Sequence, residues 1–287
     1  MSKTREYHID VGGTDLAVIE WPGSGDPILL LHATGFHKRC WNEVVLRLPG
    51  RHVYAADLRY HGNSGSEGQV QWSVMAQDVC QLLEKLDLHN VIGVGHSMGG
   101  QLLARAAARH PERFRHLVLI DPVIMDPARH ASLAQLRANF SASDHPVSRR
   151  RNRWRDAQEM YERFRERPPF DTWQPAVLKD YCDYALRPKD EEEWQQLACD
   201  PINEAAIYMH HEDNQSIYEE LDRIRTPVTL LRAPSGDSTV PDFTLSPTWP
   251  ALASALRDCR EVYLPHLNHF IPMQDPELVA QHILALN

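Results

Sequence analysis

Short apolar runs, separated by segments of helical periodicity, constrain the fold more than any other feature of this sequence. The runs are long enough for a β-strand but far too short for a membrane-spanning helix. Continuous apolar runs of this kind are typical of strands buried on both faces, and their alternation with helices predicts a mostly parallel sheet. The runs lie at 27–31, 53–56, 91–95, 116–120, 228–231 and 261–264, and the helical patterns at 73–86, 98–109, 252–257 and 276–286.

Two further segments complete the predicted architecture. Residues 7–11 and 14–19 alternate around Gly12-Gly13, a dipeptide that tolerates the positive φ angles of a tight turn, and so predict an antiparallel hairpin. The hairpin brings the expected sheet to eight strands. Between residues 122 and 225 no strand-like run occurs, and Arg, Glu, Trp and Pro dominate a helical texture. We therefore expect an α/β core of residues 1–121 and 226–287 with an inserted helical cap at 122–225.

Composition excludes several classes of protein. With 287 residues, 43% hydrophobic and 24% charged, the chain has the composition of an ordinary globular protein. A net charge of −9 disfavours a general nucleic-acid or anionic-membrane surface, and no apolar run could span a bilayer. The N-terminal residues lack the pattern of a secretory signal, and five scattered cysteines predict neither a zinc site nor disulfides. We expect a cytoplasmic protein without nucleic-acid or membrane partners.

One stretch departs locally from the acidic balance. Residues 149–167 contain eight arginines, but four acidic residues interleave with them. Glu159 and Arg163 stand at the i, i+4 spacing of paired charges on a helix. We interpret the stretch as a solvated helix, with a site for an anionic substrate or partner, including nucleic acid, as the alternatives.

The motif Gly95-His96-Ser97-Met98-Gly99 carries the strongest chemical signal. It directly follows a predicted strand and opens a predicted helix, which is the context in which a G-x-S-x-G pattern indicates a nucleophile on a sharp turn. Small neighbours are needed there because the backbone of the nucleophile is strained and crowded. Ser97 is therefore the candidate nucleophile.

A serine hydroxyl needs a base, and the base needs a carboxylate that orients it. His269 follows the last predicted strand and is the preferred base, with His266 as the alternative. Asp237 follows the strand at 228–231 and is the preferred acid. Asp121, at the end of the strand at 116–120, is its rival.

The oxyanion of a tetrahedral intermediate needs backbone N–H donors. One donor usually belongs to the residue after the nucleophile, here Met98, and another to an early loop at the same sheet edge. Residues 32–36 form such a loop after the strand at 27–31, so Thr34 is the second candidate. His32 is interpreted as a residue that orients this loop rather than a catalytic one.

Taken together, these motifs resemble the α/β-hydrolases over nearly the whole chain outside the cap. The segment His32-Ala33-Thr34-Gly35 is similar to the family's oxyanion loop, and residues 57–64 are similar to its D-x-R-G-x-G-x-S loop. Residues 95–100 and the loops of Asp237 and His269 complete the match. Two departures are Ala33 and Tyr60, where the family usually has glycine.

The resemblance implies a cofactor-independent serine hydrolase that binds no metal and cleaves a small or medium carboxylic ester. Haloalkane dehalogenases and epoxide hydrolases of this fold use an aspartate where this chain has Ser97, and hydroxynitrile lyases use a lysine that none of the five lysines matches. The alternatives are a carbon–carbon bond hydrolase of the meta-cleavage-product type, a thioesterase or lactonase, and a hydrolase-fold receptor without turnover. For the carbon–carbon hydrolase, cap arginines and His210-His211 could bind a substrate carboxylate.

The cap is expected to roof the substrate pocket and exclude water. Large apolar and aromatic side chains in or near it are the candidate contacts. The predicted pocket residues are Phe36, Tyr60, Phe140, Trp173, Trp194 and Met209.

Overall fold

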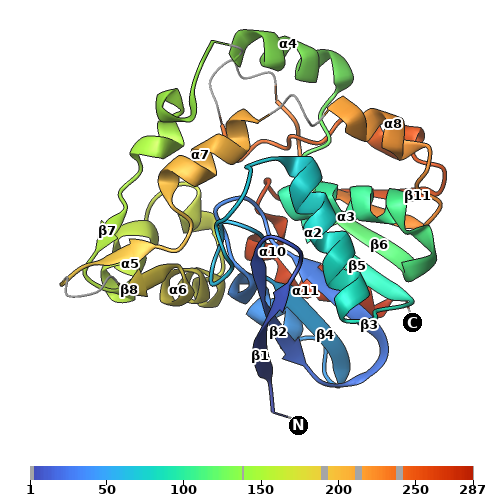
Figure 1. The fold of residues 1–287 in the computed structure, drawn as a ribbon, viewed down its shortest axis with the longest axis horizontal. Helices are drawn as coiled ribbons and strands as arrows, with labels where there is room; N and C mark the ends of the chain where they lie inside the picture. The colour runs from blue at the N-terminus through green and yellow to red at the C-terminus, as the bar shows by residue number, and fades with distance from the viewer. Residues whose placement is uncertain (1–2, 138, 189–192, 211–214, 237–241, 287) are drawn as a thin grey trace.

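The computed structural model describes residues 3–137, 139–188, 193–210, 215–236 and 242–286 (Figure 1). Within these residues eight strands form one sheet in the order β1-β2-β4-β3-β5-β6-β10-β11. This confirms the predicted eight-stranded α/β-hydrolase sheet. Its strands are β1 (Arg5–Asp10), β2 (Asp15–Trp21), β3 (Ser24–Leu31), β4 (Arg51–Ala56), β5 (Val91–His96), β6 (Phe114–Ile120), β10 (Val228–Arg232) and β11 (Cys259–Tyr263).

The sheet is parallel except at its N-terminal edge. Strand β1 pairs antiparallel with β2 across the turn at Gly12-Gly13, where φ is +80° and +117°. Strand β2 is also antiparallel to β4, and the remaining neighbours are parallel. The parallel strands therefore end at one common edge, and β5 lies between β3 and β6 at its centre.

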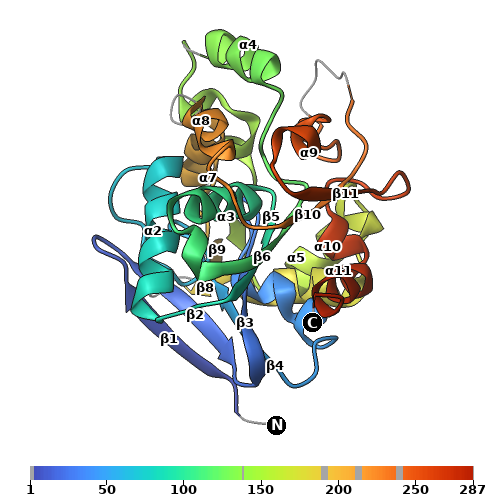
Figure 2. The ribbon, with the colours of Figure 1, turned by 90° about the vertical axis from the view of Figure 1, so that its right-hand side faces the viewer.

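Helices cover both faces of the sheet, as Figure 2 shows. The strand side chains divide between two apolar clusters, one on each face. One face is covered by α2 (Trp72–Lys85), α3 (Met98–Arg109), α8 (Ile217–Leu221) and α9 (Leu252–Ala255); the other is covered by α1 (Asn42–Val45), α10 (Ile271–Gln274) and α11 (Pro276–Leu284).

The segment between β6 and β10 lies above the carboxyl edge of the sheet (Figure 1). It contains the expected helices and, in addition, three short strands that the sequence does not predict, which form a small antiparallel sheet in the order β7-β9-β8. Strands of two or three residues carry too little periodicity to be found in a sequence. The elements are α4 (Pro127–Arg137), β7 (Arg153–Trp154), α5 (Ala157–Phe164), α6 (Pro175–Tyr184), β8 (Leu186–Pro188), β9 (Gln195–Leu197) and α7 (Pro201–Met209).

The remaining parts of the inserted segment are short. Helix α8 falls inside the predicted cap range but packs on α3 of the core, where Glu220 pairs with Arg105 and Arg109. Single turns of 3₁₀-helix occupy Ala142–Asp144, Pro146–Arg149 and Phe170–Thr172 in the inserted segment, and Lys38–Trp41 and Pro111–Arg113 in the core.

The five cysteines are free thiols, and four of them are buried. Among the described residues, no helix combines the length and the apolar character that a bilayer crossing requires. Across the same residues, no group of three or more histidine, cysteine or carboxylate side chains is placed to hold a metal ion.

Candidate active site

Ser97 occupies a sharp turn between β5 and α3. Its φ of 56° and ψ of −116° place it in a region that side-chain-bearing residues rarely adopt. The turn is tight enough to require the glycines around it. A Cβ at Gly95 would lie 2.5 Å from the Gly99 backbone, and one at Gly99 would lie 2.3 Å from the carbonyl oxygen of Leu31. The crowding fixes the Ser97 side chain at the carboxyl edge of the sheet.

His269 lies beside Ser97 on the loop after β11. Its Nε2 is 3.1 Å from Ser97 Oγ, within hydrogen-bond distance. The main chain of His269 is held on both sides, because its N–H donates to Thr244 O at 2.8 Å and its carbonyl accepts from His96 Nε2 at 2.8 Å. Burial lowers the pKa of His96 well below its ordinary value, so this ring is a neutral donor. His269 thus has the position expected for a base.

The carboxylate that contacts His269 is Asp121. Its Oδ2 accepts from His269 Nδ1 at 2.6 Å, and the side chain is fully buried. The other oxygen, Oδ1, accepts from Ala233 N at 3.1 Å and from the Ser246 hydroxyl at 2.6 Å. The Thr248 hydroxyl is 3.4 Å from Oδ1 but donates to Pro122 O at 2.7 Å. Donors on Oδ1 compensate for the burial of the carboxylate and leave Oδ2 for the imidazole.

Of the two predicted acids, the structure places the alternative, Asp121, against His269, where its carboxylate accepts the hydrogen bond from Nδ1. The preferred residue, Asp237, lies outside the described residues. The position of Asp121 in the sequence already indicates this placement. Asp121 directly follows β6, and β6 runs parallel to its neighbour β5, so Asp121 and Ser97 lie at the same edge of the sheet.

The predicted oxyanion donors lie on two loops that touch. Gly99 N donates to His32 O at 3.2 Å, and the Thr34 hydroxyl contacts Met98 Sδ at 3.4 Å. Thr34 and Met98 are both buried. In the described part of the chain no hydrogen bond uses either backbone amide. These N–H groups are therefore available to a developing negative charge.

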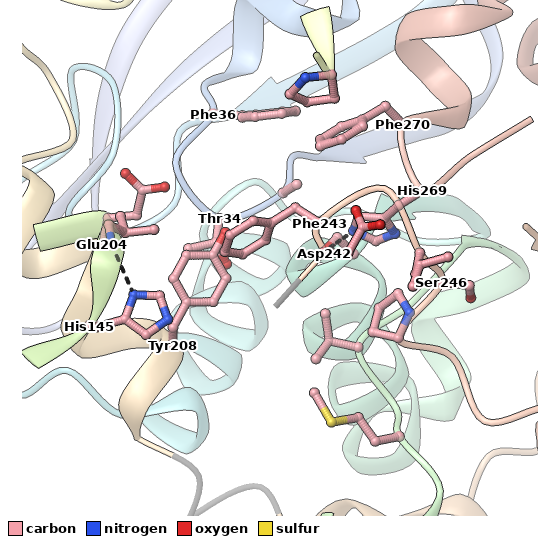
Figure 3. A pocket seen from close by; sticks show the side chains of 18 of the residues that line it. Thr34, Phe36, His145, Glu204, Tyr208, Asp242, Phe243, Ser246, His269 and Phe270 are labelled. Atoms are coloured by element: carbon pink, nitrogen blue, oxygen red, sulfur yellow. Dashed lines mark hydrogen bonds between the residues drawn. The ribbon is translucent and has the colours of Figure 1, made fainter. Parts of the chain in front are cut away.

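A cavity of about 360 Å³ opens onto Ser97 and His269 (Figure 3). Its wall is mainly apolar and comes from the core loops and from the inserted segment. Figure 3 shows Phe36 beside Phe270 on one wall and His145 beside Tyr208 on another. Further apolar lining residues are Trp72, Val123, Met125, Leu133, Phe170 and Phe243.

Of the six predicted pocket residues, only Phe36 lines this cavity. Tyr60 is buried in the core, where its hydroxyl donates to Gly68 O at 2.7 Å. Trp173 packs edge-on behind Phe36 in the apolar interior of the inserted segment. Phe140 and Trp194 are 61% and 38% exposed, and Met209 is half-buried away from the lining. Aromatic character alone did not distinguish a cavity wall from a core or a surface.

Charged residues of the cavity wall were not anticipated individually. Arg150, inside the arginine-rich stretch interpreted as solvated, donates to Glu204 Oε2 at 2.6 Å and to the Tyr181 hydroxyl at 3.2 Å. Burial raises the pKa of Glu204, and it raises the pKa of Tyr181 to about 12. Arg129 on α4 also reaches the wall, whereas His210 does not and His211 lies outside the described residues. The partner of Arg150 is 54 positions away, so local charge patterning could not reveal it.

Solved structures of similar fold cover almost the whole chain. An E-2-(acetamidomethylene)succinate hydrolase aligns over 99% of both chains with a TM-score of 0.74 and 21% identity. The thioesterase domain from the curacin biosynthetic pathway aligns over 99% of this chain and 100% of its own, with the same TM-score and 19% identity. At these identities the likeness shows the fold alone.

Sequence relatives match over a shorter part of the chain. A proposed non-heme haloperoxidase of Mycobacterium phage D29 is 38% identical over 34% of this chain and 37% of its own length. The sn-1-specific diacylglycerol lipase ABHD11 of Xenopus laevis is 34% identical over 37% of this chain and 36% of its own. These matches thus span little more than a third of either partner.

The sequence pattern of the Alpha/beta hydrolase family matches residues 28–282. That range begins within β3 and contains the turn of Ser97, the inserted segment and the loop of His269. With the strand order and hydrolase relatives, this match supports a hydrolase. The chain belongs to the alpha/beta hydrolase family.

Proposed function

We propose that this protein is a serine hydrolase that cleaves a small or medium carboxylic ester through an acyl-enzyme. The observation that carries the proposal is the continuous hydrogen-bonded series from Ser97 Oγ through the His269 ring to Asp121 Oδ2 at the base of the cavity. Nucleophile, base and orienting carboxylate stand in the order that acyl transfer requires.

In the first half-reaction, Ser97 Oγ attacks the ester carbonyl carbon while His269 Nε2 takes the hydroxyl proton. The Nδ1–H bond to Asp121 stabilises the resulting imidazolium, and the amides of Thr34 and Met98 donate to the oxyanion. Collapse of the intermediate breaks the carbon–oxygen bond, and His269 returns the proton to the departing alcohol. Water, activated by the same imidazole, then releases the carboxylic acid and restores Ser97.

The cavity supports an apolar acyl or alcohol group of limited size. Its volume of about 360 Å³ is at the small end of ligand pockets, and its wall is dominated by aromatic and aliphatic side chains. We propose that residues 122–225, apart from α8, form a cap over the cavity, because α4 contributes Leu133 and α6 contributes Tyr181 to its wall.

The experiment that tests the proposal is hydrolysis of p-nitrophenyl esters from acetate to palmitate by wild type and Ser97→Ala. A fluorophosphonate probe should also label wild type and not the variant. Cleavage over one range of chain length, lost in Ser97→Ala, is the expected result. Equal residual cleavage by both proteins, or no labelling of wild type, would contradict the proposal and favour a ligand-binding protein without turnover.

A second candidate is hydrolysis of an acidic substrate by the same three residues, including carbon–carbon cleavage of a dienoate or opening of a lactone. The observation that favours it is the pair of guanidinium groups, Arg129 and Arg150, on the cavity wall. Arg129 has no ion-pair partner within the described residues, whereas Arg150 is balanced by Glu204. Turnover of a dienoate or an acidic lactone that exceeds ester cleavage, and that is lost in Arg129→Gln, would favour this candidate. Thioester cleavage is tested in the same series with acyl-thiol substrates.

A further inference from the structure

Two buried histidines, His32 and His61, lie behind the loop that carries Thr34. Their side chains are almost fully inaccessible, and their ring centroids are 5.0 Å apart. Neither belongs to the hydrogen-bonded series of Ser97, His269 and Asp121. Burying two imidazoles costs free energy unless their nitrogens are paired, so their partners indicate what they do.

The loop itself is a tight turn of four residues. Phe36 N donates to Ala33 O at 3.1 Å, and Gly35, at the third position, has a φ of +79°. A turn closed in this way with a positive φ at its third residue needs glycine there. Of the three peptide units in the turn, Ala33–Thr34 carries the Thr34 N–H and Thr34–Gly35 carries the Gly35 N–H. The two units share the Thr34 Cα, so their orientations together set the direction of the Thr34 N–H.

His32 fixes the first of these peptide units. Its Nδ1 donates to Ala33 O at 2.8 Å, while its Nε2 accepts from Leu58 N at 2.9 Å. In a trans peptide the carbonyl and the N–H point in opposite directions. Holding the Ala33 carbonyl on the histidine side therefore directs the Thr34 N–H away from it.

His61 fixes the second unit. Its Nε2 accepts from Gly35 N at 2.9 Å, and its Nδ1 donates to Arg59 O at 2.8 Å. These partners require one neutral tautomer, with the proton on Nδ1. Burial lowers the pKa of His61 to about 4, which keeps Nε2 an acceptor at neutral pH.

The segment that carries His61 is held firmly. Arg59 makes two hydrogen bonds to Asp78, at 2.8 and 2.6 Å, and Asp57 accepts from both the backbone and the ammonium of Lys38 at 2.6 Å. All four of these side chains are buried. The imidazole is thus a fixed acceptor, and the turn must adapt to it.

We propose that His61 is a positioning residue of the oxyanion hole, which holds the Gly35 amide so that the Thr34 amide faces the carbonyl attacked by Ser97. The inference rests on the proposed function. It assigns to residues 57–64 a role in catalysis that is exerted through the backbone of the neighbouring turn, without contact with substrate.

The test compares His61→Asn with His61→Gln. Asparagine retains a donor for Arg59 O but is too short to reach Gly35 N, whereas the glutamine oxygen can take the place of Nε2. His116→Asn is the matched control, because His116 bonds to Thr229 Oγ1 at 2.9 Å within the sheet, away from the turn. Each variant is assayed for kcat and KM on the best ester. Each is also titrated with an alkyl trifluoromethyl ketone, which forms a tetrahedral adduct, and with the matching methyl ketone.

His61→Asn should lower kcat by about 10- to 100-fold with KM changed less than threefold, since one displaced oxyanion donor costs up to about 10²–10³ in rate. Affinity for the trifluoromethyl ketone should fall by the same factor while that for the methyl ketone is unchanged. His61→Gln should recover to within about fivefold of wild type, and His116→Asn should match wild type. Unchanged kcat in His61→Asn, or equal loss of affinity for both ketones, would overturn the inference.

If His61→Asn does not fold, nitrogen-15 chemical shifts of the wild-type histidines provide the measurement. A His61 ring protonated on Nδ1 alone supports the inference, and one protonated on Nε2 overturns it. The proposed function fails separately, because a wild type that neither cleaves esters nor reacts with a fluorophosphonate contradicts that proposal whatever the state of His61.

Discussion

The carboxyl edge of the sheet and the segment above it are built on different principles. At the edge, each functional group is fixed by several buried hydrogen bonds. Asp121 accepts from three donors, and the main chain of His269 is held at both its N–H and its carbonyl. The segment between β6 and β10 consists of short helices and strands of two or three residues, and its contribution to the cavity is mainly side-chain surface.

Under the proposed function, this difference corresponds to two separate roles. Groups that must meet a reacting atom within a few tenths of an ångström are placed by the sheet and its turns. Groups that set the size and polarity of the cavity are placed by the inserted segment. Substitutions at the edge should therefore lower turnover of every substrate, whereas substitutions in the wall should change the order of preference among substrates.

The largest effect should come from Ser97→Ala. Without the nucleophile no acyl-enzyme forms, and we expect kcat to fall by at least about 10⁴-fold for every ester tested. Thermal unfolding should show a stable variant, because the change removes one hydroxyl that faces the cavity. A loss confined to some chain lengths would contradict the division between edge and wall.

The next largest effect should distinguish the two predicted acids. Asp121→Asn should lower kcat by about 10³- to 10⁴-fold, since an amide in this position favours the wrong tautomer of His269. Asp237→Asn is the matched comparison and should change kcat less than threefold. Steady-state rates on one ester at several pH values measure both. A large loss in Asp237→Asn with little in Asp121→Asn would reverse the assignment.

The sequence predicted the edge well because its signals are local. Ser97, Thr34 and His269 each stand within five residues of the end of a strand-length apolar run, which placed them at one edge once the parallel sheet was inferred. Asp121 and Asp237 both follow a predicted parallel strand, so the sequence pattern favours neither of them. The choice depends on which carboxylate lies closer to His269, and this distance cannot be read from the sequence. In the structure Asp121 accepts the hydrogen bond from His269 Nδ1, and Asp237 lies outside the described residues.

The inserted segment was predicted poorly because its structure depends on contacts between residues that are far apart in the sequence. Its small sheet is stabilised by pairing between β7 and β9, which are about forty positions apart, rather than by any run of apolar residues. Arg150 showed the charge pattern of a solvated helix, yet its partner is the buried Glu204. Whether Trp173 lines a cavity or packs behind Phe36 depends on contacts between elements, which residue type does not encode.

A smaller effect should appear in the pH dependence of the free energy of unfolding, and it should come from the buried histidines at the edge of the sheet. Burial lowers the pKa of His32 to about 3 and that of His61 to about 4, below the 6.5 of an exposed histidine. Between about pH 6.5 and these values the unfolded chain binds more protons, so the free energy of unfolding falls as the pH is lowered. Each histidine contributes up to about 1.4 kcal/mol per pH unit. Thermal unfolding from pH 7.5 to 4.5 should be less steep in His61→Gln, and an unchanged slope would contradict this account.

The smallest effect should come from the wall, and it should depend on substrate. Leu133 on α4 lines the cavity, so Leu133→Trp should reduce its volume and lower kcat/KM for the longest ester cleaved by about tenfold, with less than twofold change for acetate. Phe140→Ala is the control, because that side chain is exposed and does not line the cavity. The chain-length profiles of the three proteins provide the measurement. If Leu133→Trp lowers the rates of all esters equally, the wall acts on the chemistry itself, and the separation of turnover from preference does not hold.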